Sequence, residues 1–192
     1  MRGVGPDAPT LCEGWNTRDL AAHLMVREYR PDAAPGIMIP FFASHTAKVQ
    51  NEVAEQTDWD ELLNKVASGP PIYSPLKLLD PVANVAEMFI HHEDVRRAQQ
   101  GWEPRVLEPD LATMLRRTLP LMARMTLAKV PGRVALRTPD GKTVLTVGRG
   151  AAVRVTGTPE ELLLFCVGRQ ARVEFDGEAS AVQAVRDAPK GL

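Results

Sequence analysis

The pattern of apolar and polar residues along the chain changes near Pro131. Before that point, apolar residues recur every three or four positions, which is typical of amphipathic helices. After it, short alternating or β-branched runs predict strands. The sequence therefore predicts an α+β protein, with an antiparallel helical bundle in residues 1–130 and a small α+β part in residues 131–192.

Five helices are expected in the first part, each bounded by a capping residue, a glycine or a proline. They run from Asn16 or Thr17 to Arg30, from Phe41 to Gln56, from Asp58 to about Gly69, from Asp80-Pro81 to Gly101, and from Asp110 to about Lys129 with Pro120 inside. A loop rich in proline, alanine and glycine separates the first two helices, from Pro31 to Pro40.

The second part contains strand and turn signals in close succession. RVALRT and KTVLTV lie on either side of Pro139-Asp140-Gly141, which predicts a β-hairpin. AAVRVT and RVEF predict two further strands. Between them, Thr158-Pro159-Glu160-Glu161 is typical of a capping box with proline at the first helical position, so a helix is expected to reach Gly168. SAVQAVRDA predicts a last short helix.

Composition and charge narrow the classes of function. The 192 residues are 44% hydrophobic, which is enough to form a core. The formal net charge is −1, from 23 basic and 24 acidic residues, so the strongly basic face of a nucleic-acid-binding protein is not expected. No run reaches ~18 uninterrupted apolar residues, the minimum for a membrane span. Neither nucleic acid nor a membrane is therefore expected as a partner.

The two cysteines indicate a reducing environment. Cys12 and Cys166 are far apart in the sequence and have no metal-type spacing, so a disulfide framework is not expected. The first residues, MRGVGPDAPT, lack the apolar core of a signal peptide, and the expected location is the cytoplasm. Cys12 lies beside Glu13, which disfavours a thiolate, and Cys166 lies in an apolar helical run. Neither cysteine is expected to be a nucleophile.

The stretch EMFIHHED contains the most informative side chains. Glu87 and His91 are four residues apart, so both lie on one face of the expected helix and could hold one edge of a divalent metal. A third ligand must come from another helix, and His23 is the best candidate because it lies among apolar residues of an amphipathic helix. Two imidazoles and a carboxylate suit zinc or another divalent transition metal. Three protein ligands would leave a coordination position open, as in catalytic sites.

Three other polar residues, His92, Asp94 and His45, each have more than one possible role. The side chain of His92 is rotated by about 100° around the helix axis from that of His91. His92 is expected to lie at the surface or to contact a metal ligand without binding the metal itself. Asp94 lies on roughly the same face as His91, where it could support a ligand, bind an arginine or simply face solvent. His45 is expected to be a partly buried helix histidine rather than a fourth ligand. The spacing of Glu87 and His91 also fits a solvated pair on a helix surface.

Three segments resemble the mycothiol-dependent maleylpyruvate isomerase family, which belongs to the DinB-like metal-binding helical bundles. LCEGWNTRDLAAHL, residues 11–24, resembles the first motif of that family, and EMFIHHEDVRRA, residues 87–98, resembles the second. TGTPEELLLFCVG, residues 156–168, and the following R-x-x-R-V-E-F-D-G resemble its C-terminal domain. The resemblance covers nearly the whole chain and is greatest to an actinobacterial metal-binding branch. It implies a DinB-like bundle followed by a sterol-carrier-like α+β domain.

The resemblance also implies a site and a reaction. The ligand triad of the family falls on His23, Glu87 and His91, the same three residues that the spacing indicates. Mycothiol would bind at the open metal position as a thiolate and add to an electrophilic substrate, as a cosubstrate of an isomerase or transferase. Arg169, with Arg172 as the rival position, is expected to hold a substrate carboxylate.

Several alternatives to this function stay open at the level of the sequence. The same metal site could serve another thiol transfer or a hydrolysis. The chain could also be a non-catalytic protein that binds a metal or a small molecule, or a carrier of an apolar ligand through its C-terminal domain. Turnover with mycothiol would separate the enzymatic hypotheses from the binding ones.

The beginning of the chain departs from the family pattern. Relatives carry a further helix before the first motif, whereas this sequence begins ten residues before Leu11. Either the natural start lies upstream, or the bundle lacks its first helix. In the second case an apolar groove would be left uncovered, and a homodimer formed through that face is expected.

Overall fold

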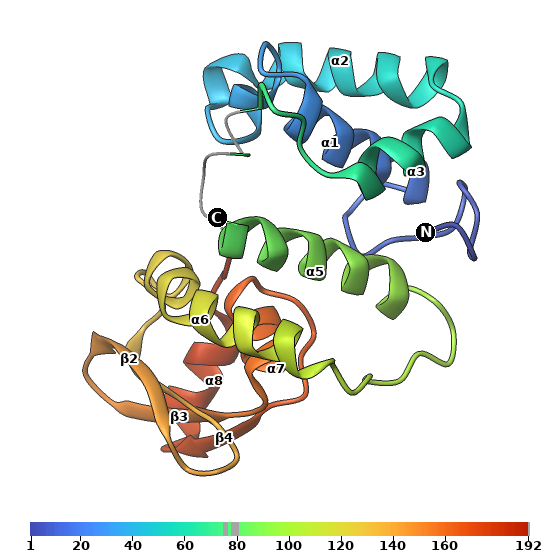
Figure 1. The fold of residues 1–192 in the computed structure, drawn as a ribbon. Coiled ribbons are helices and arrows are strands. Elements are labelled where there is room, and N and C mark those ends of the chain that lie inside the picture. The colour runs from blue at the N-terminus through green and yellow to red at the C-terminus, as the bar shows by residue number, and fades with distance from the viewer. Residues whose placement is uncertain (75–76, 78–80, 192) are drawn as a thin grey trace. The chain divides into compact units, whose positions relative to one another are not determined.

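The computed structural model of the chain describes residues 1–74, 77 and 81–191. Within these residues it has seven α-helices and one four-stranded mixed sheet, which confirms the α+β class. The chain divides into two compact units, Met1–Arg105 and Val106–Leu192 (Figure 1). Among the described residues, no helix combines the length and apolar character that crossing a bilayer requires.

The first unit is helical. Its elements are α1 (Thr17–Tyr29), the short 3₁₀ helices η1 (Ala34–Ile37) and η2 (Pro40–Phe42), α2 (Ala43–Gln56), α3 (Trp59–Ser68) and α5 (Pro81–Arg97). Helices α2 and α3 both pack on α1 (Figure 1), and buried apolar side chains of the three helices form one core. The members of this core from α1 include Ala21, Leu24 and Val26, each at most 1% exposed. His23, which carries the candidate imidazole, is therefore placed by a rigid helix.

Capping side chains start α1 and α3 where the sequence predicts. The Asn16 side chain accepts the backbone N–H of Asp19 at 3.0 Å, and the Asp19 carboxylate accepts the backbone N–H of Asn16 at 3.0 Å. This reciprocal pair is a capping box, so Asn16 is the cap of α1. At α3, the Asp58 carboxylate accepts two backbone N–H groups of the first turn at 2.9 and 3.2 Å.

Helix α5 carries Glu87 and His91 and begins at Pro81, as expected. The cap predicted at Asp80 lies outside the described residues. The helix ends at Arg97, one turn before the predicted end at Gly101. In the last turn, the buried Glu93 carboxylate accepts from Arg97 at 2.8 Å and from Arg105 of the following loop at 3.1 Å. Glu93 thus joins the following loop to the end of α5.

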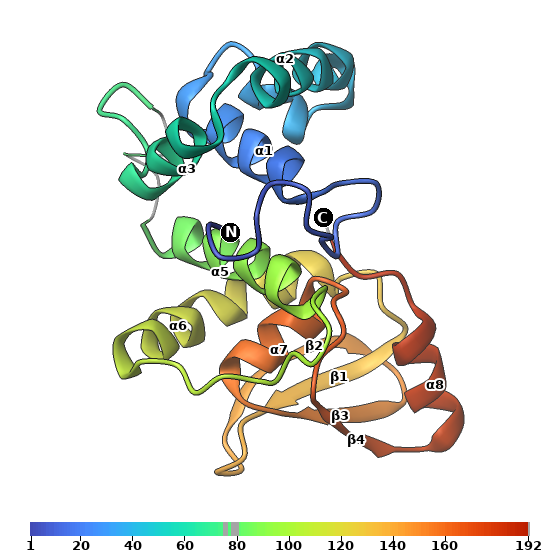
Figure 2. The same ribbon diagram turned by 90° about the vertical axis from the view of Figure 1, so that its right-hand side faces the viewer.

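The second unit packs helices on a small sheet. Its elements are α6 (Pro109–Thr126), β1 (Gly132–Arg137), β2 (Thr143–Arg149), β3 (Ala152–Thr156), α7 (Pro159–Cys166), β4 (Glu174–Gly177) and α8 (Ala179–Asp187). The strand order is β2-β1-β3-β4. The predicted hairpin pairs β1 with β2 antiparallel, whereas β3 runs parallel to β1 and antiparallel to β4. Figure 2 shows α8 beside the strands, and it contacts β1, β3 and β4.

The capping box predicted at the start of α7 is wrong, although the helix begins at Pro159 as expected. The Thr158 side chain makes no capping hydrogen bond. Glu161, its expected partner, instead accepts the backbone N–H of Arg172 at 2.7 Å. The carboxylate thus fastens the segment between α7 and β4 instead of closing on its own helix.

The boundary between the units lies between Arg105 and Val106, whereas the sequence analysis placed it near residue 130. Helix α6 contacts α7 and β2 of the second unit. Its side chains Leu115, Leu119 and Ala123 are all fully buried. Apolar periodicity predicts that α6 is a helix, but it does not show which neighbour will cover its apolar face.

We predict that α6 is required for the second unit to fold. A fragment of residues 106–192 should unfold cooperatively on heating, followed by circular dichroism. A fragment of residues 131–192 lacks the buried leucines of α6, each worth about 1.5–3 kcal/mol, and should show no cooperative transition. Equal unfolding transitions in the two fragments would contradict the assignment of α6 to the second unit.

Candidate metal centre

Helices α1 and α5 bring the three predicted ligands together. His23 lies on α1, and Glu87 and His91 lie one turn apart on α5. One ligand atom from each residue lies within 4.8 Å of the other two. The closest pair is His91 Nε2 and Glu87 Oε1, at 3.2 Å, and the rings of His23 and His91 meet edge to face with centroids 5.5 Å apart. The residues that sequence spacing singled out therefore form one cluster.

His23 is held as a neutral imidazole. It is only 8% exposed, and its ring lies 5.0 Å from that of Trp15. Burial, together with the nearby His91, lowers the pKa of His23 to about 4. Nδ1 is 3.3 Å from the Gln50 Oε1 atom, a hydrogen bond that places the proton on Nδ1. The lone pair of Nε2 is then available for a metal.

The other edge of the His91 ring faces a second group of donors. Nδ1 lies 3.1 Å from the Asp94 Oδ2 atom and 3.9 Å from the Cys12 sulfur. The Cys12 thiol donates to the same Oδ2 atom at 3.2 Å. The side chain of Asp94 is fully buried, so the alternative that Asp94 faces solvent is wrong. Cys12, His91 and Asp94 also have ligand atoms within 4.8 Å of one another.

The loop before α1 places Cys12 beside α5. The backbone N–H of Leu11 donates to the Asp94 carbonyl oxygen at 3.0 Å, which attaches the loop to the helix. Two further hydrogen bonds fix the loop itself, from the Cys12 N–H to Thr10 Oγ1 at 3.1 Å and from the Trp15 N–H to the Cys12 carbonyl at 3.0 Å. The sequence analysis missed Cys12, because no local spacing connects it with His91.

The charges in the cluster compensate one another. Burial opposes a charged His91, but hydrogen bonds with Asp94, Cys12 and Glu87 outweigh it and raise the pKa of His91 to about 11. Burial also opposes ionisation of Glu87, yet His91 and Arg27 keep the pKa of that carboxyl below its usual value. Arg27 Nε is 4.0 Å from Glu87 Oε1. The His91 ring is thus an imidazolium between two carboxylates, in a position where a cation is already stabilised.

Glu28 is a buried carboxyl near the same helices. Asn84, one turn before Glu87 on α5, donates to Glu28 Oε1 at 3.5 Å. The other oxygen, Oε2, has no hydrogen-bond partner among the described residues. Burial raises the pKa of Glu28 above its usual value. Glu28 therefore takes up a proton more readily than a solvent-exposed glutamate does, and no motif in the sequence indicated it.

The remaining candidate residues lie elsewhere. His92 is exposed, as expected, and is 3.4 Å from Arg105. His45 is exposed on α2, so the expectation that it is partly buried is wrong. Arg169 and Arg172 belong to the second unit, in the segment between α7 and β4. The role proposed for either arginine stays a prediction.

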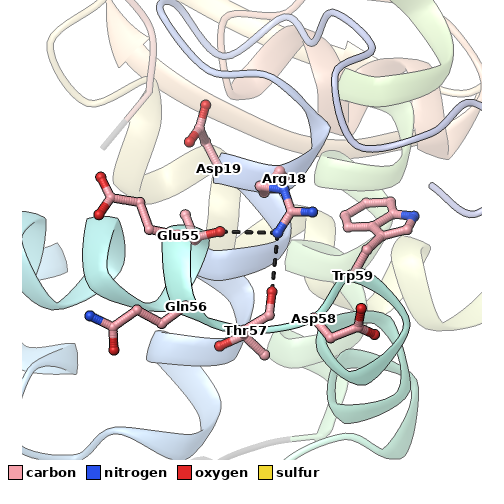
Figure 3. A pocket seen from close by; sticks show the side chains of 8 residues that line it. Arg18, Asp19, Glu55, Gln56, Thr57, Asp58 and Trp59 are labelled. Carbon is pink, nitrogen blue, oxygen red and sulfur yellow. Dashed lines mark hydrogen bonds between the residues drawn. The ribbon is translucent and has the colours of Figure 1, made fainter.

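A pocket of about 590 Å³ lies at the start of α1 and the turn between α2 and α3 (Figure 3). The Arg18 guanidinium inside it donates to the carbonyl oxygens of Ala54 and Thr57 at 3.0 and 3.1 Å. It also lies over the Trp59 ring, 5.7 Å from its centroid. Arg18 therefore caps the end of α2, and the pocket includes none of the candidate ligands.

Comparison with known protein families, with curated proteins and with solved structures found no match for this chain. Membership of the isomerase-like family stays a prediction from the two motifs and the C-terminal segment.

We predict that the two histidines of the cluster differ in charge in the metal-free protein. Long-range ¹H–¹⁵N NMR spectra should show a neutral His23 and a doubly protonated His91 at neutral pH. Because folding raises the pKa of His91, protonation of His91 stabilises the folded state. This stabilisation is complete below pH 6.5, the approximate pKa of histidine in the unfolded chain, and it is lost as the pH rises toward about 11. Asp94→Asn should lower the pKa of His91, and Asp110→Asn, at an exposed position, should leave it unchanged. A wild-type His91 that titrates near 6.5 would contradict this description.

Proposed function

We propose that the chain binds one divalent transition metal through His23, Glu87 and His91, with zinc as the expected ion, and that this site activates a small-molecule thiol. The observation that carries the proposal is the convergence of the three ligand atoms within 4.8 Å, from two helices that are distant in the sequence. Two imidazole nitrogens and a carboxylate oxygen are a donor set that zinc commonly uses.

The spacing of the ligand atoms and the hydrogen-bond acceptors behind the two imidazoles also fit a bound metal. Ligand atoms of tetrahedral zinc lie about 3.3 Å apart, given bonds of ~2.0–2.1 Å, and Glu87 and His91 already have that separation at 3.2 Å. Zinc-binding imidazoles normally donate their second N–H to an oxygen, and Gln50 and Asp94 are placed to accept it. The His23 ligand atom lies within 4.8 Å of the other two, so a side-chain adjustment would have to bring it to the tetrahedral separation.

The proposed reaction follows the resemblance to the mycothiol-dependent family. His23, Glu87 and His91 would hold the metal, and its positive charge would favour the nucleophilic thiolate form of a thiol that binds there. Arg169 is proposed to bind a carboxylate of that substrate, and Arg172 is the rival. A reducing cytoplasm, expected from the cysteine usage, would keep such a thiol reduced.

The finer architecture belongs to the same proposal. The helices of the first unit are proposed to form a DinB-like bundle, and the second unit a sterol-carrier-like domain. The homodimer expected from an uncovered helix face also stays a prediction, which light scattering at micromolar concentration would test. Large apolar side chains are exposed after α1, with Phe41 85% exposed and Met38 64% exposed.

The first prediction from the proposal concerns metal content. Purified wild-type protein should hold about one zinc ion per chain, measured by atomic emission after dialysis. His91→Ala removes one of three ligands and should lower zinc affinity by about 100-fold or more, beyond the effect of losing an outer hydrogen bond. His92→Ala, at the exposed neighbouring histidine, is the matched control and should keep full affinity. Full zinc occupancy in His91→Ala would refute the assignment.

The second prediction concerns the thiol. In cobalt-substituted protein, mycothiol should produce the intense near-ultraviolet band of sulfur-to-cobalt charge transfer, because the thiolate binds at the open position. The experiment needs Cys12→Ser as background, since the Cys12 sulfur is itself 3.9 Å from His91. His23→Ala in that background should abolish the band. If millimolar mycothiol leaves the spectrum unchanged, thiol-dependent catalysis is wrong, and a non-catalytic metal-binding role becomes the better interpretation.

A further inference from the structure

We propose that Cys12, His91 and Asp94 form a second metal site, for a thiophilic divalent ion such as cadmium, on the edge of the His91 ring opposite Glu87. The proposal does not require that the His23 site be occupied. It depends on three donor atoms that the loop before α1 and the last turns of α5 bring together.

The spacing of the three atoms is close to that of a tetrahedral site. With a metal–sulfur bond of ~2.3 Å and metal–nitrogen or metal–oxygen bonds of ~2.0–2.1 Å, sulfur should lie about 3.6 Å from each other donor, and nitrogen about 3.3 Å from oxygen. The corresponding separations are 3.9 Å for Cys12 to His91, 3.2 Å for Cys12 to Asp94 and 3.1 Å for His91 to Asp94. Each differs from the tetrahedral value by a few tenths of an ångström.

The three donors are also held in place before any metal binds. The Asp94 side chain is fully buried, and His91 is 9% exposed on the same helix. The Leu11 N–H bond to the Asp94 carbonyl fixes the loop that carries Cys12 against that helix. Cys12 is only half-buried, which leaves a path for an ion from solvent. Little conformational freedom would be lost on binding.

The charge and softness of the donors favour a thiophilic dication. A thiolate and a carboxylate together carry two negative charges, which match a divalent ion in a largely buried place. Thiolate is a soft ligand that selects cadmium or zinc over magnesium or calcium. On binding, the ion replaces the proton of the Cys12 thiol and the Nδ1 proton of His91, and both protons pass to solvent. The Nε2 proton stays on the ring, where Glu87 accepts it at 3.2 Å.

The two sites would share one imidazole and therefore compete. A neutral ring has a single lone pair, on either Nε2 or Nδ1. With a metal on Nε2, Asp94 accepts the Nδ1 proton, and with a metal on Nδ1, Glu87 accepts the Nε2 proton. Glu87 is thus a ligand in the His23 site and a hydrogen-bond acceptor for the Cys12 site, and Asp94 has the opposite pair of roles. A soft ion at Cys12 would withdraw His91 from the His23 site.

Cadmium titration of the full-length chain tests this site by a signal that the His23 site cannot give. The wild type should develop the ultraviolet band of sulfur-to-cadmium charge transfer and saturate at one ion per chain. Cys12→Ser should abolish the band and lower cadmium affinity by about 100-fold. His23→Ala should keep both the band and the affinity. Cys166→Ser is the control for the second thiol, which is fully buried with a pKa raised to about 12, and should behave as the wild type.

The outcomes separate this proposal from the proposed function. A wild-type protein without the band, or a band that persists in Cys12→Ser, would overturn the second site. Loss of the band in His23→Ala would also overturn it, because the sulfur would then belong to a single joint site. If His23→Ala abolishes zinc binding and Cys12→Ser leaves it intact, the zinc ion binds at the His23 site alone.

Discussion

The interaction on which the rest of the site depends is the placement of the His91 imidazole between two carboxylates of its own helix. Glu87 lies 3.2 Å from one ring nitrogen and Asp94 lies 3.1 Å from the other. The ring cannot turn without breaking one of these contacts, and each nitrogen is aimed at a different set of donors. In the metal-free protein the ring carries the positive charge that a bound ion would otherwise supply.

The cluster of candidate ligands lies in the first of the two units. Helix α1, whose apolar side chains are buried in the core of the first unit, carries His23, and Gln50 of α2 bonds to its Nδ1 atom. The loop before α1 is joined to α5 through Leu11, which brings Cys12 to the far edge of the His91 ring. Rigid elements thus position every donor, as a metal site requires.

Helical periodicity and capping residues were sufficient to predict most elements, and they also predicted that His23, Glu87 and His91 would meet. These signals are local, because a cap acts within one turn and the pair at positions 87 and 91 shares a helix face. The errors arose where the structure depends on distant contacts. Thr158 makes no capping hydrogen bond, and Glu161 accepts from the distant Arg172 backbone. Helix α6 belongs to the second unit, and Cys12 reaches His91 through a loop.

The central claim is that His91 presents one nitrogen to a metal held by His23 and Glu87, and the position of a bound zinc ion tests it most directly. Crystals of the wild-type protein soaked in zinc, measured on both sides of the zinc absorption edge, would locate the ion by its anomalous signal. The account predicts one peak about 2.1 Å from His91 Nε2, with His23 and Glu87 as the other protein ligands. A zinc ion bound away from His91 Nε2, or held without His23 and Glu87, would contradict it.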